Sequence, residues 1–151
     1  MVEACLLVAS QVLVLDQGIE ILARGLLPVL SERPLVPGLG LVWQTADPGR
    51  NPSSGLLTVW IAVSVIVIIG LATVVSRTGP RFTAIQALAM GLILGGSASH
   101  LVDLLHWGDV VATLHLTTPA VEAFTGIARL AQWSGLGLLL VAAVGRRRAV
   151  S

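Results

Sequence analysis

The chain has 151 residues, of which 55% are hydrophobic and 11% charged, with a mean hydropathy of +0.91 and a formal net charge of +1. A soluble domain is close to half apolar and about a quarter charged, so this composition indicates an integral membrane protein. No lysine is present and the charges nearly balance, so the sequence lacks the basic surface that nucleic-acid binding requires. The single cysteine, Cys5, excludes an internal disulfide and is predicted to be a small packing residue.

Four apolar runs reach or nearly reach the roughly 20 residues that a helix needs to cross a bilayer. They cover about residues 4–22, 56–75, 82–105 and 127–144. The first run lacks a basic leader and a small-residue cleavage site and carries Asp16 and Glu20, so it reads as a retained helix and not a signal peptide. We therefore predict a single membrane domain over residues 1–151, with an all-α fold of four transmembrane helices.

Arginines indicate the orientation of these spans. Arg77 and Arg81 stand in the short link between the second and third runs, and three more arginines follow the last run at 146–148. Because arginine is enriched on the cytoplasmic side of membrane proteins, both termini and the central link are predicted to be cytoplasmic. We expect a multi-pass protein of the cell membrane, that is, the inner or cytoplasmic membrane.

Two longer connections then lie on the outer face, at residues 23–55 and about 106–126. The first contains five prolines, which exclude a single helix because proline breaks the backbone hydrogen bonding of a helix interior. Between the prolines, residues 39–43 (LGLVW) are typical of one short strand. The connections predict a small extracytoplasmic cap that can include short strands.

Ionisable residues within the first span mark it as functional, because each costs about 2.5 to 3.5 kcal/mol to insert into a membrane. Asp16 and Glu20 are four residues apart and so share one helix face. They serve either as interfacial anchors or hydrogen-bond partners of a loop, or as a paired-carboxylate catalyst, although two residues of one helix seldom converge on one substrate atom.

The third span holds a second polar group. Its His100, Asp103 and His106 drift around the helix and specify no fourth ligand, so we predict no metal site and no cofactor. Small residues precede them and predict close helix packing: Gly95, Gly96, Ser97 and Ser99. Arg129, near the start of the last span, needs a carboxylate partner, and Asp103 stands at a suitable depth; we expect an ion pair between them.

These motifs together resemble signal peptidase II, the lipoprotein signal peptidase. That family is an intramembrane aspartyl peptidase that removes signal peptides from diacylglyceryl-modified prolipoproteins with two aspartates. In the first span, Asp16 and Gln17 match the family's Asp-Gln-x-x-Lys, with Glu20 in place of lysine. After the first outer connection, Asn51 matches the asparagine of an Arg-Asn-x-Gly motif whose glycine is Ser53 here.

The third span carries the strongest resemblance. The family's Gly-Gly-x-x-Gly-Asn-x-x-Asp-Arg aligns without a gap on residues 95–104, with Gly95, Gly96 and Asp103 kept. Ser99, His100 and Leu104 stand in place of its third glycine, asparagine and arginine, and its Gly-x-Val-Val matches residues 108–111. The next position, a catalytic aspartate in the family, is Ala112. The second catalytic aspartate corresponds to Arg129, with Gly126 in place of the family's asparagine.

These departures change the predicted function. An aspartyl peptidase needs one carboxylate as base and one carboxylic acid as proton donor, whereas alanine has no titrating group and arginine stays protonated. We therefore expect a catalytically inactive homologue whose retained cavity binds membrane lipid, a prolipoprotein signal peptide or another membrane protein. Its predicted binding residues are Asp16, Asn51, His100, Asp103 and Arg129. The cation at position 129 favours anionic lipid headgroups.

Two alternatives stay open. A lipoprotein signal peptidase with a rearranged site could use Asp109 together with Asp103 or Glu122. A small helical subunit of a larger membrane complex would need no catalytic group at all.

Overall fold

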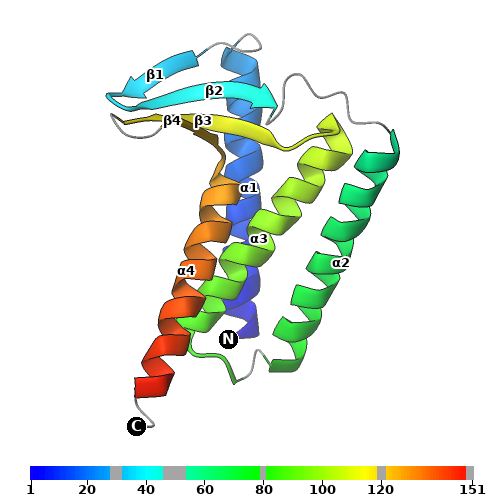
Figure 1. The fold of residues 1–151 in the computed structure, drawn as a ribbon, viewed down its shortest axis with the longest axis vertical. Coiled ribbons are helices and arrows are strands. Elements are labelled where there is room, and N and C mark those ends of the chain that lie inside the picture. Colours follow the sequence, from blue (N-terminus) through cyan, green and yellow to red (C-terminus); the bar gives the residue numbers. More distant parts are fainter. Residues whose placement is uncertain (28–31, 46–53, 79–80, 119–121, 149–151) are drawn as a thin grey trace.

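The computed structural model describes residues 1–27, 32–45, 54–78, 81–118 and 122–148. Its helices are α1 (Val2–Leu26), α2 (Ser54–Thr78), α3 (Ala84–Trp107) and α4 (Ile127–Arg148). Its strands are β1 (Glu32–Val36), β2 (Leu39–Thr45), β3 (Val111–Thr117) and β4 (Glu122–Thr125). The strands form a sheet across one end of the helices, and the beginning of α1 lies at the opposite end (Figure 1).

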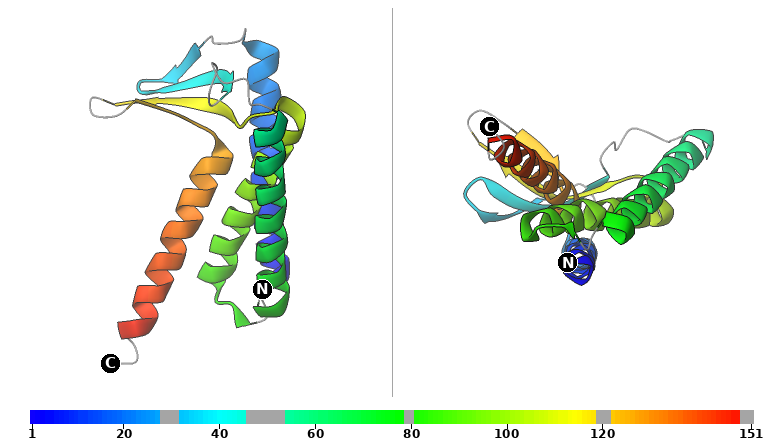
Figure 2. Two further views of the ribbon diagram at one scale, coloured as in Figure 1. Left: turned by 45° about the vertical axis from the view of Figure 1, so that its right-hand side comes forward. Right: turned by 90° about the horizontal axis from the view of Figure 1, so that it is seen from below.

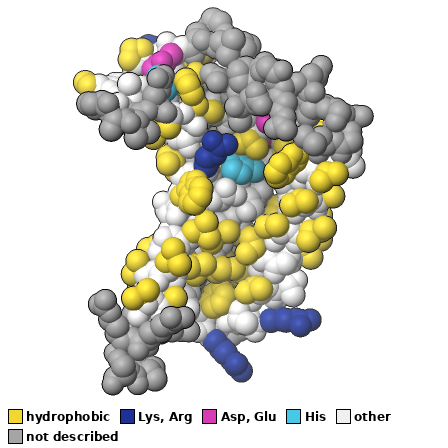
Figure 3. All heavy atoms as spheres, viewed as in Figure 1, with side chains coloured by type: hydrophobic (Ala, Val, Ile, Leu, Met, Phe, Trp, Pro, Cys, Tyr) yellow, Lys and Arg dark blue, Asp and Glu magenta, His cyan; other side chains and the backbone are white. Residues whose placement is uncertain are grey.

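The four predicted spans are confirmed as four helices that are long and apolar enough to cross a membrane. Those stretches are Val2–Leu26, Leu57–Thr78, Ala84–Trp107 and Ile127–Val144. Hydrophobic side chains are spread over the helical surface in view, and basic side chains lie at the end away from the sheet (Figure 3). The cytoplasmic placement of that end stays a prediction.

The sheet is wholly antiparallel, with strand order β1-β2-β3-β4. The strand predicted at residues 39–43 is confirmed, and β2 continues for two further residues. The strands β3 and β4 lie in the connection at 106–126, where short strands were expected in general but no strand was located from the sequence. The fold is therefore mostly helical with a four-stranded sheet, built from the two connections in which short strands were allowed for; the extracytoplasmic side of this sheet stays a prediction.

One row of residues ties the four strands together. The Glu32 side chain of β1 passes over Gly40 of β2, so that a Cβ at position 40 would overlap its carboxylate. Glu32 Oε2 lies 2.8 Å from the Nδ1 atom of His115 on β3, and the His115 ring stacks on Phe124 of β4 at 4.4 Å between centroids. A side chain at position 40 would therefore displace the Glu32 side chain that links β1 to His115 of β3.

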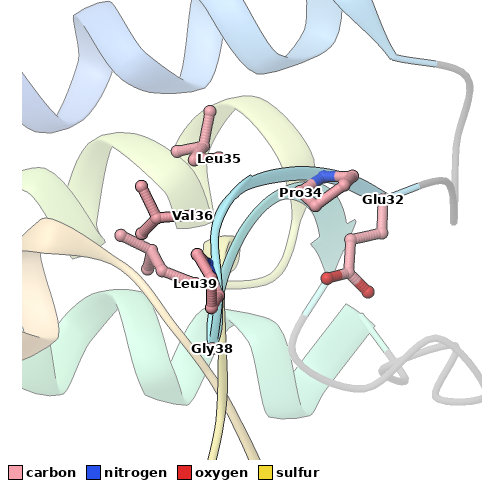
Figure 4. A pocket seen from close by; sticks show the side chains of 7 residues that line it. Glu32, Pro34, Leu35, Val36, Gly38 and Leu39 are labelled. Carbon is pink, nitrogen blue, oxygen red and sulfur yellow. The ribbon is translucent and has the colours of Figure 1, made fainter.

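The turn between β1 and β2 carries an open pocket on its apolar side. Its lining includes Pro34, Leu35, Val36 and Leu39, with Glu32 at its margin. Leu35 and Val36 lie on one side of the turn and Glu32 on the other (Figure 4), and both apolar side chains are more than half exposed.

Glycines of α3 allow α1 and α4 to approach its backbone closely, as predicted for this span. A Cβ at Gly95 would lie 2.6 Å from the carbonyl oxygen of Ala9 on α1, and one at Gly96 would overlap Ala128 on α4. Consecutive helical residues point about 100° apart, so two adjacent glycines serve two different neighbours. Gly91, one turn before Gly95, meets α1 in the same way.

The end of the bundle away from the sheet has a small-residue core. Cys5 is fully buried there with Val75, Ala87 and Met90, from α1, α2 and α3. The prediction that Cys5 is a packing residue is confirmed.

We expect Gly95→Val to lower the free energy of unfolding by about 2 kcal/mol or more, because its side chain must displace the α1 backbone. Gly70→Val is the matched control, since a Cβ at Gly70 of α2 meets nothing within 4 Å. Thermal unfolding of both variants in detergent measures the difference. Equal midpoints for the two variants would show that α1 and α3 are not in close contact.

Candidate functional site

A cluster of polar side chains lies buried where α1 and α3 approach the sheet. We call it the polar cluster: Asp16, Gln17 and Glu20 of α1 with Ser99 and Asp103 of α3. Its three carboxyl groups are 5% exposed or less.

The Gln17 amide contacts three other residues of the polar cluster. Its Nε2 atom donates to Asp103 Oδ1 at 2.8 Å, to Ser99 Oγ at 3.1 Å and to Glu20 Oε2 at 3.2 Å. Since Asp103 and Glu20 both contact this one nitrogen, their oxygens lie within about 6 Å of each other. One neutral side chain thus holds two acidic groups near each other.

Asp16 joins the polar cluster to α4. Its Oδ2 atom accepts from Ser99 Oγ at 2.7 Å, and its Oδ1 atom accepts from the backbone N–H of Ala128 at 2.9 Å. Ala128 is the second residue of α4, where backbone N–H groups have no partner within their own helix. A carboxylate is favoured there by hydrogen bonding and by the positive end of the helix dipole. Asp16 therefore caps α4 from another helix.

Gly126 makes room for this cap. It stands directly before α4, at the position where a capping side chain would ordinarily sit. A Cβ at Gly126 would lie 3.4 Å from Asp16 Oδ1 and 3.3 Å from the Val111 carbonyl oxygen. The missing side chain is replaced by the carboxylate of Asp16.

Asp103 joins α3 to the sheet, and the ion pair we expected with Arg129 is wrong. Its second oxygen, Oδ2, accepts from the backbone N–H of Val111 at 3.3 Å, at the start of β3. Arg129 Nη1 instead donates to the Phe124 carbonyl oxygen at 3.5 Å. Successive residues of a helix are rotated by about 100° about its axis. Because Ala128 faces Asp16, the side chain of Arg129 points from α4 in a different direction.

The remaining predicted site residues lie around the polar cluster. Ala112 is 3% exposed within β3, and Arg129 is half-buried in the first turn of α4. His100 is half-buried on α3 and interacts electrostatically with both Asp16 and Arg129. Asp109 follows α3, where its Oδ1 accepts from Val110 N at 2.8 Å. Asn51 and the side chain of Glu122 lie outside what the structure describes.

An aromatic group that the sequence did not single out borders Glu20. The Arg24 guanidinium lies 4.4 Å above the Trp107 ring, and Trp43 of β2 meets Trp107 edge to face at 5.9 Å. Trp107 is close enough to Glu20 to interact with its carboxyl group. In the sequence, Glu20 and Arg24 are four residues apart, which predicts that they share a helix face. Trp107 is more than eighty residues later in the chain, so no sequence pattern places it beside them.

Some buried polar atoms of the described residues have no hydrogen-bond partner: Glu20 Oε1, Trp43 Nε1 and Thr113 Oγ1. Leaving such an atom unpaired costs about 1 to 3 kcal/mol. The described residues form no group of three or more His, Cys, Asp or Glu side chains able to hold a metal ion.

The profile of the family described as Signal peptidase (SPase) II matches residues 8–144. The chain belongs to the signal peptidase II family. Two solved bacterial membrane enzymes, determined by the in meso method at 2.3 and 1.9 Å resolution, share its fold. The first has a TM-score of 0.80 and 18% identity over 93% of this chain and 87% of its own. The second has a TM-score of 0.79 and 17% identity over 92% and 91%. Comparison with curated protein sequences gives no match.

Within this signal peptidase II fold, we expect Asp16→Ala to lower the free energy of unfolding by about 1 to 3 kcal/mol. The substitution leaves the Ala128 N–H and the Ser99 hydroxyl without their acceptor. Glu3→Ala, at an exposed position of the same helix, is the control. Unfolding in detergent compares the two, and an Asp16 variant as stable as the Glu3 variant would contradict the capping role.

A double-mutant cycle distinguishes the two partners considered for Asp103. Asp103→Ala and Arg129→Ala should be additive within about 0.5 kcal/mol, whereas Asp103→Ala and Gln17→Ala should not be. Unfolding free energies of the single and double variants provide both coupling terms. If Asp103→Ala is coupled to Arg129→Ala and additive with Gln17→Ala, the ion pair between Asp103 and Arg129 is correct after all.

Proposed function

We propose that this signal peptidase II homologue binds its ligand without cleaving it, as a pseudoenzyme. The observation that carries this proposal is the pair of residues aligned with the family's catalytic aspartates, Ala112 and Arg129. Ala112 offers no proton-transfer group, and a guanidinium cannot deprotonate water at physiological pH. The general acid and base of an aspartyl peptidase are both missing from these positions.

The two aspartates kept in the helices support the same conclusion. All four carboxylate oxygens of Asp16 and Asp103 already accept a hydrogen bond within the fold. Two of the donors are backbone N–H groups, at the start of α4 and of β3. These carboxylates hold elements together, which favours a structural role for them over proton transfer.

The proposed ligands are membrane lipid, the signal peptide of a prolipoprotein or another membrane protein of the cell membrane. Arg129 and His100 provide polar contacts at the sheet end of α3 and α4, while Asp16 and Asp103 hold the surrounding elements. A guanidinium in a water-poor site stabilises a carbonyl oxygen or an anion by direct hydrogen bonds.

A second candidate is a lipoprotein signal peptidase with a rearranged site. It is favoured by the proximity of Glu20 to Asp103, which share the Gln17 amide, and by the unpartnered Oε1 of Glu20 among the described residues. Two carboxyl groups at such a distance could share acid and base roles if substrate reached them. Asp109 is the other displaced carboxylate that could join Asp103.

Incubation of the purified protein with a diacylated prolipoprotein tests the proposal. We expect no cleaved product by gel mobility, because both catalytic positions lack a carboxylate. An active signal peptidase II in the same micelles serves as the positive control. Cleavage that is abolished by Glu20→Gln, Asp103→Asn or Asp109→Asn would instead establish the rearranged peptidase and identify its carboxylates.

A further inference from the structure

The Arg129 guanidinium has hydrogen-bonding capacity that the described residues do not use. A guanidinium carries five N–H donors, and within the described part of the chain Arg129 makes one long hydrogen bond, to the Phe124 carbonyl oxygen at 3.5 Å. The side chain is half-buried, so it is partly withdrawn from water. Such a group is well suited to an anionic partner with several oxygens.

The surroundings of Arg129 place it beneath the sheet, beside α3. Arg129 and His100 interact electrostatically across the α3–α4 contact. Figure 3 shows a basic side chain and a histidine side by side below the sheet, with hydrophobic side chains below them. The nearby carboxylate of Asp16 is already bonded to Ser99 and to the first turn of α4.

An apolar stripe continues from Arg129 along α4. Trp133, Leu136 and Leu140 follow at i+4, i+7 and i+11, and so lie on the same face of the helix as Arg129. Their exposed fractions are 68%, 45% and 68%. At 1.5 Å per residue the stripe extends about 16 Å, which is close to half of the roughly 30 Å hydrocarbon layer. Its length therefore matches one leaflet.

The position of α4 leaves this face open to lipid. The helix lies on the side of α3 away from α2 in both Figure 1 and the view from below in Figure 2. Its polarity also matches that of a lipid, because the cation is at the sheet end and the stripe runs toward the middle of the span. A lipid likewise has its headgroup at the interface and its acyl chains toward the mid-plane.

We infer that Arg129 and the stripe bind one phospholipid of the leaflet on the sheet side, with its phosphate on the guanidinium and an acyl chain along Trp133, Leu136 and Leu140. Arginine suits a phosphate because its planar fork makes two parallel hydrogen bonds to the oxygens. This inference rests on the proposed function, since it assigns a binding role to a position where the family has a catalytic aspartate.

Native mass spectrometry of the full chain released from detergent tests the inference. The probes are dimyristoylphosphatidylglycerol and dimyristoylglycerol, which share acyl chains and differ by the phosphate headgroup. We expect the native protein to prefer the phospholipid about tenfold or more, and Arg129→Gln to remove that preference. Arg24→Gln is the matched control, because Arg24 lies near the same end of the bundle but is stacked on Trp107.

Two further variants keep the test decisive if Arg129→Gln does not fold. Arg129→Lys should keep a reduced preference for the phospholipid, and Trp133→Ala, at an exposed position, should weaken both probes without changing their ratio. Equal binding of the two probes by the native protein, or an equal loss in the Arg24 variant, would overturn the inference. So would displacement of the phospholipid by millimolar inorganic phosphate, which would indicate a free-phosphate site.

The result is separable from the test of the proposed function. Absence of cleavage with no phospholipid preference would refute the lipid site alone. Cleavage of a prolipoprotein together with an intact, Arg129-dependent preference would refute the inactive homologue alone.

Discussion

The hydrogen bonds of the Asp16 carboxylate hold the helices together at the end of the bundle that lies next to the sheet. This carboxylate accepts hydrogen bonds from the Ser99 hydroxyl of α3 and from the Ala128 backbone N–H of α4. One side chain of α1 therefore joins three helices. These distances exist only because Gly95 and Gly96 bring α1 and α4 against the backbone of α3. Gly126, without a side chain, leaves the space in which the carboxylate reaches α4.

The same arrangement bears on the proposed loss of cleavage, because the hydrogen bonds of Asp16 and Asp103 do not involve the side chains at positions 112 and 129. Asp16 and Asp103 fix the start of α4 and of β3, which are the two segments that carry Arg129 and Ala112. Asp16 and Asp103 thus act in the fold through hydrogen bonds to backbone and side-chain donors.

Local patterns in the sequence predicted the helices, because the length and apolar composition of each span are properties of consecutive residues. The glycine contacts and the strand at β2 were predictable for the same reason. The strands β3 and β4 were not, since β3 is paired with β2, whose partner residues lie about seventy positions earlier in the chain. The predicted ion pair of Asp103 with Arg129 was wrong. The sequence indicated that both residues lie at a similar depth in the membrane, but it did not indicate in which direction the Arg129 side chain points from α4. Nothing local reveals that Asp103 bonds Gln17 and Val111 N instead.

The central claim is that the signal peptidase II scaffold here binds without cutting. Complementation of a bacterial strain depleted of its own signal peptidase II tests it most directly, because rescue requires proteolysis by whatever mechanism. With the protein present in the membrane at a level comparable to an active family member, the account predicts no restored growth and accumulation of unprocessed prolipoprotein. Growth with processed lipoprotein would contradict it.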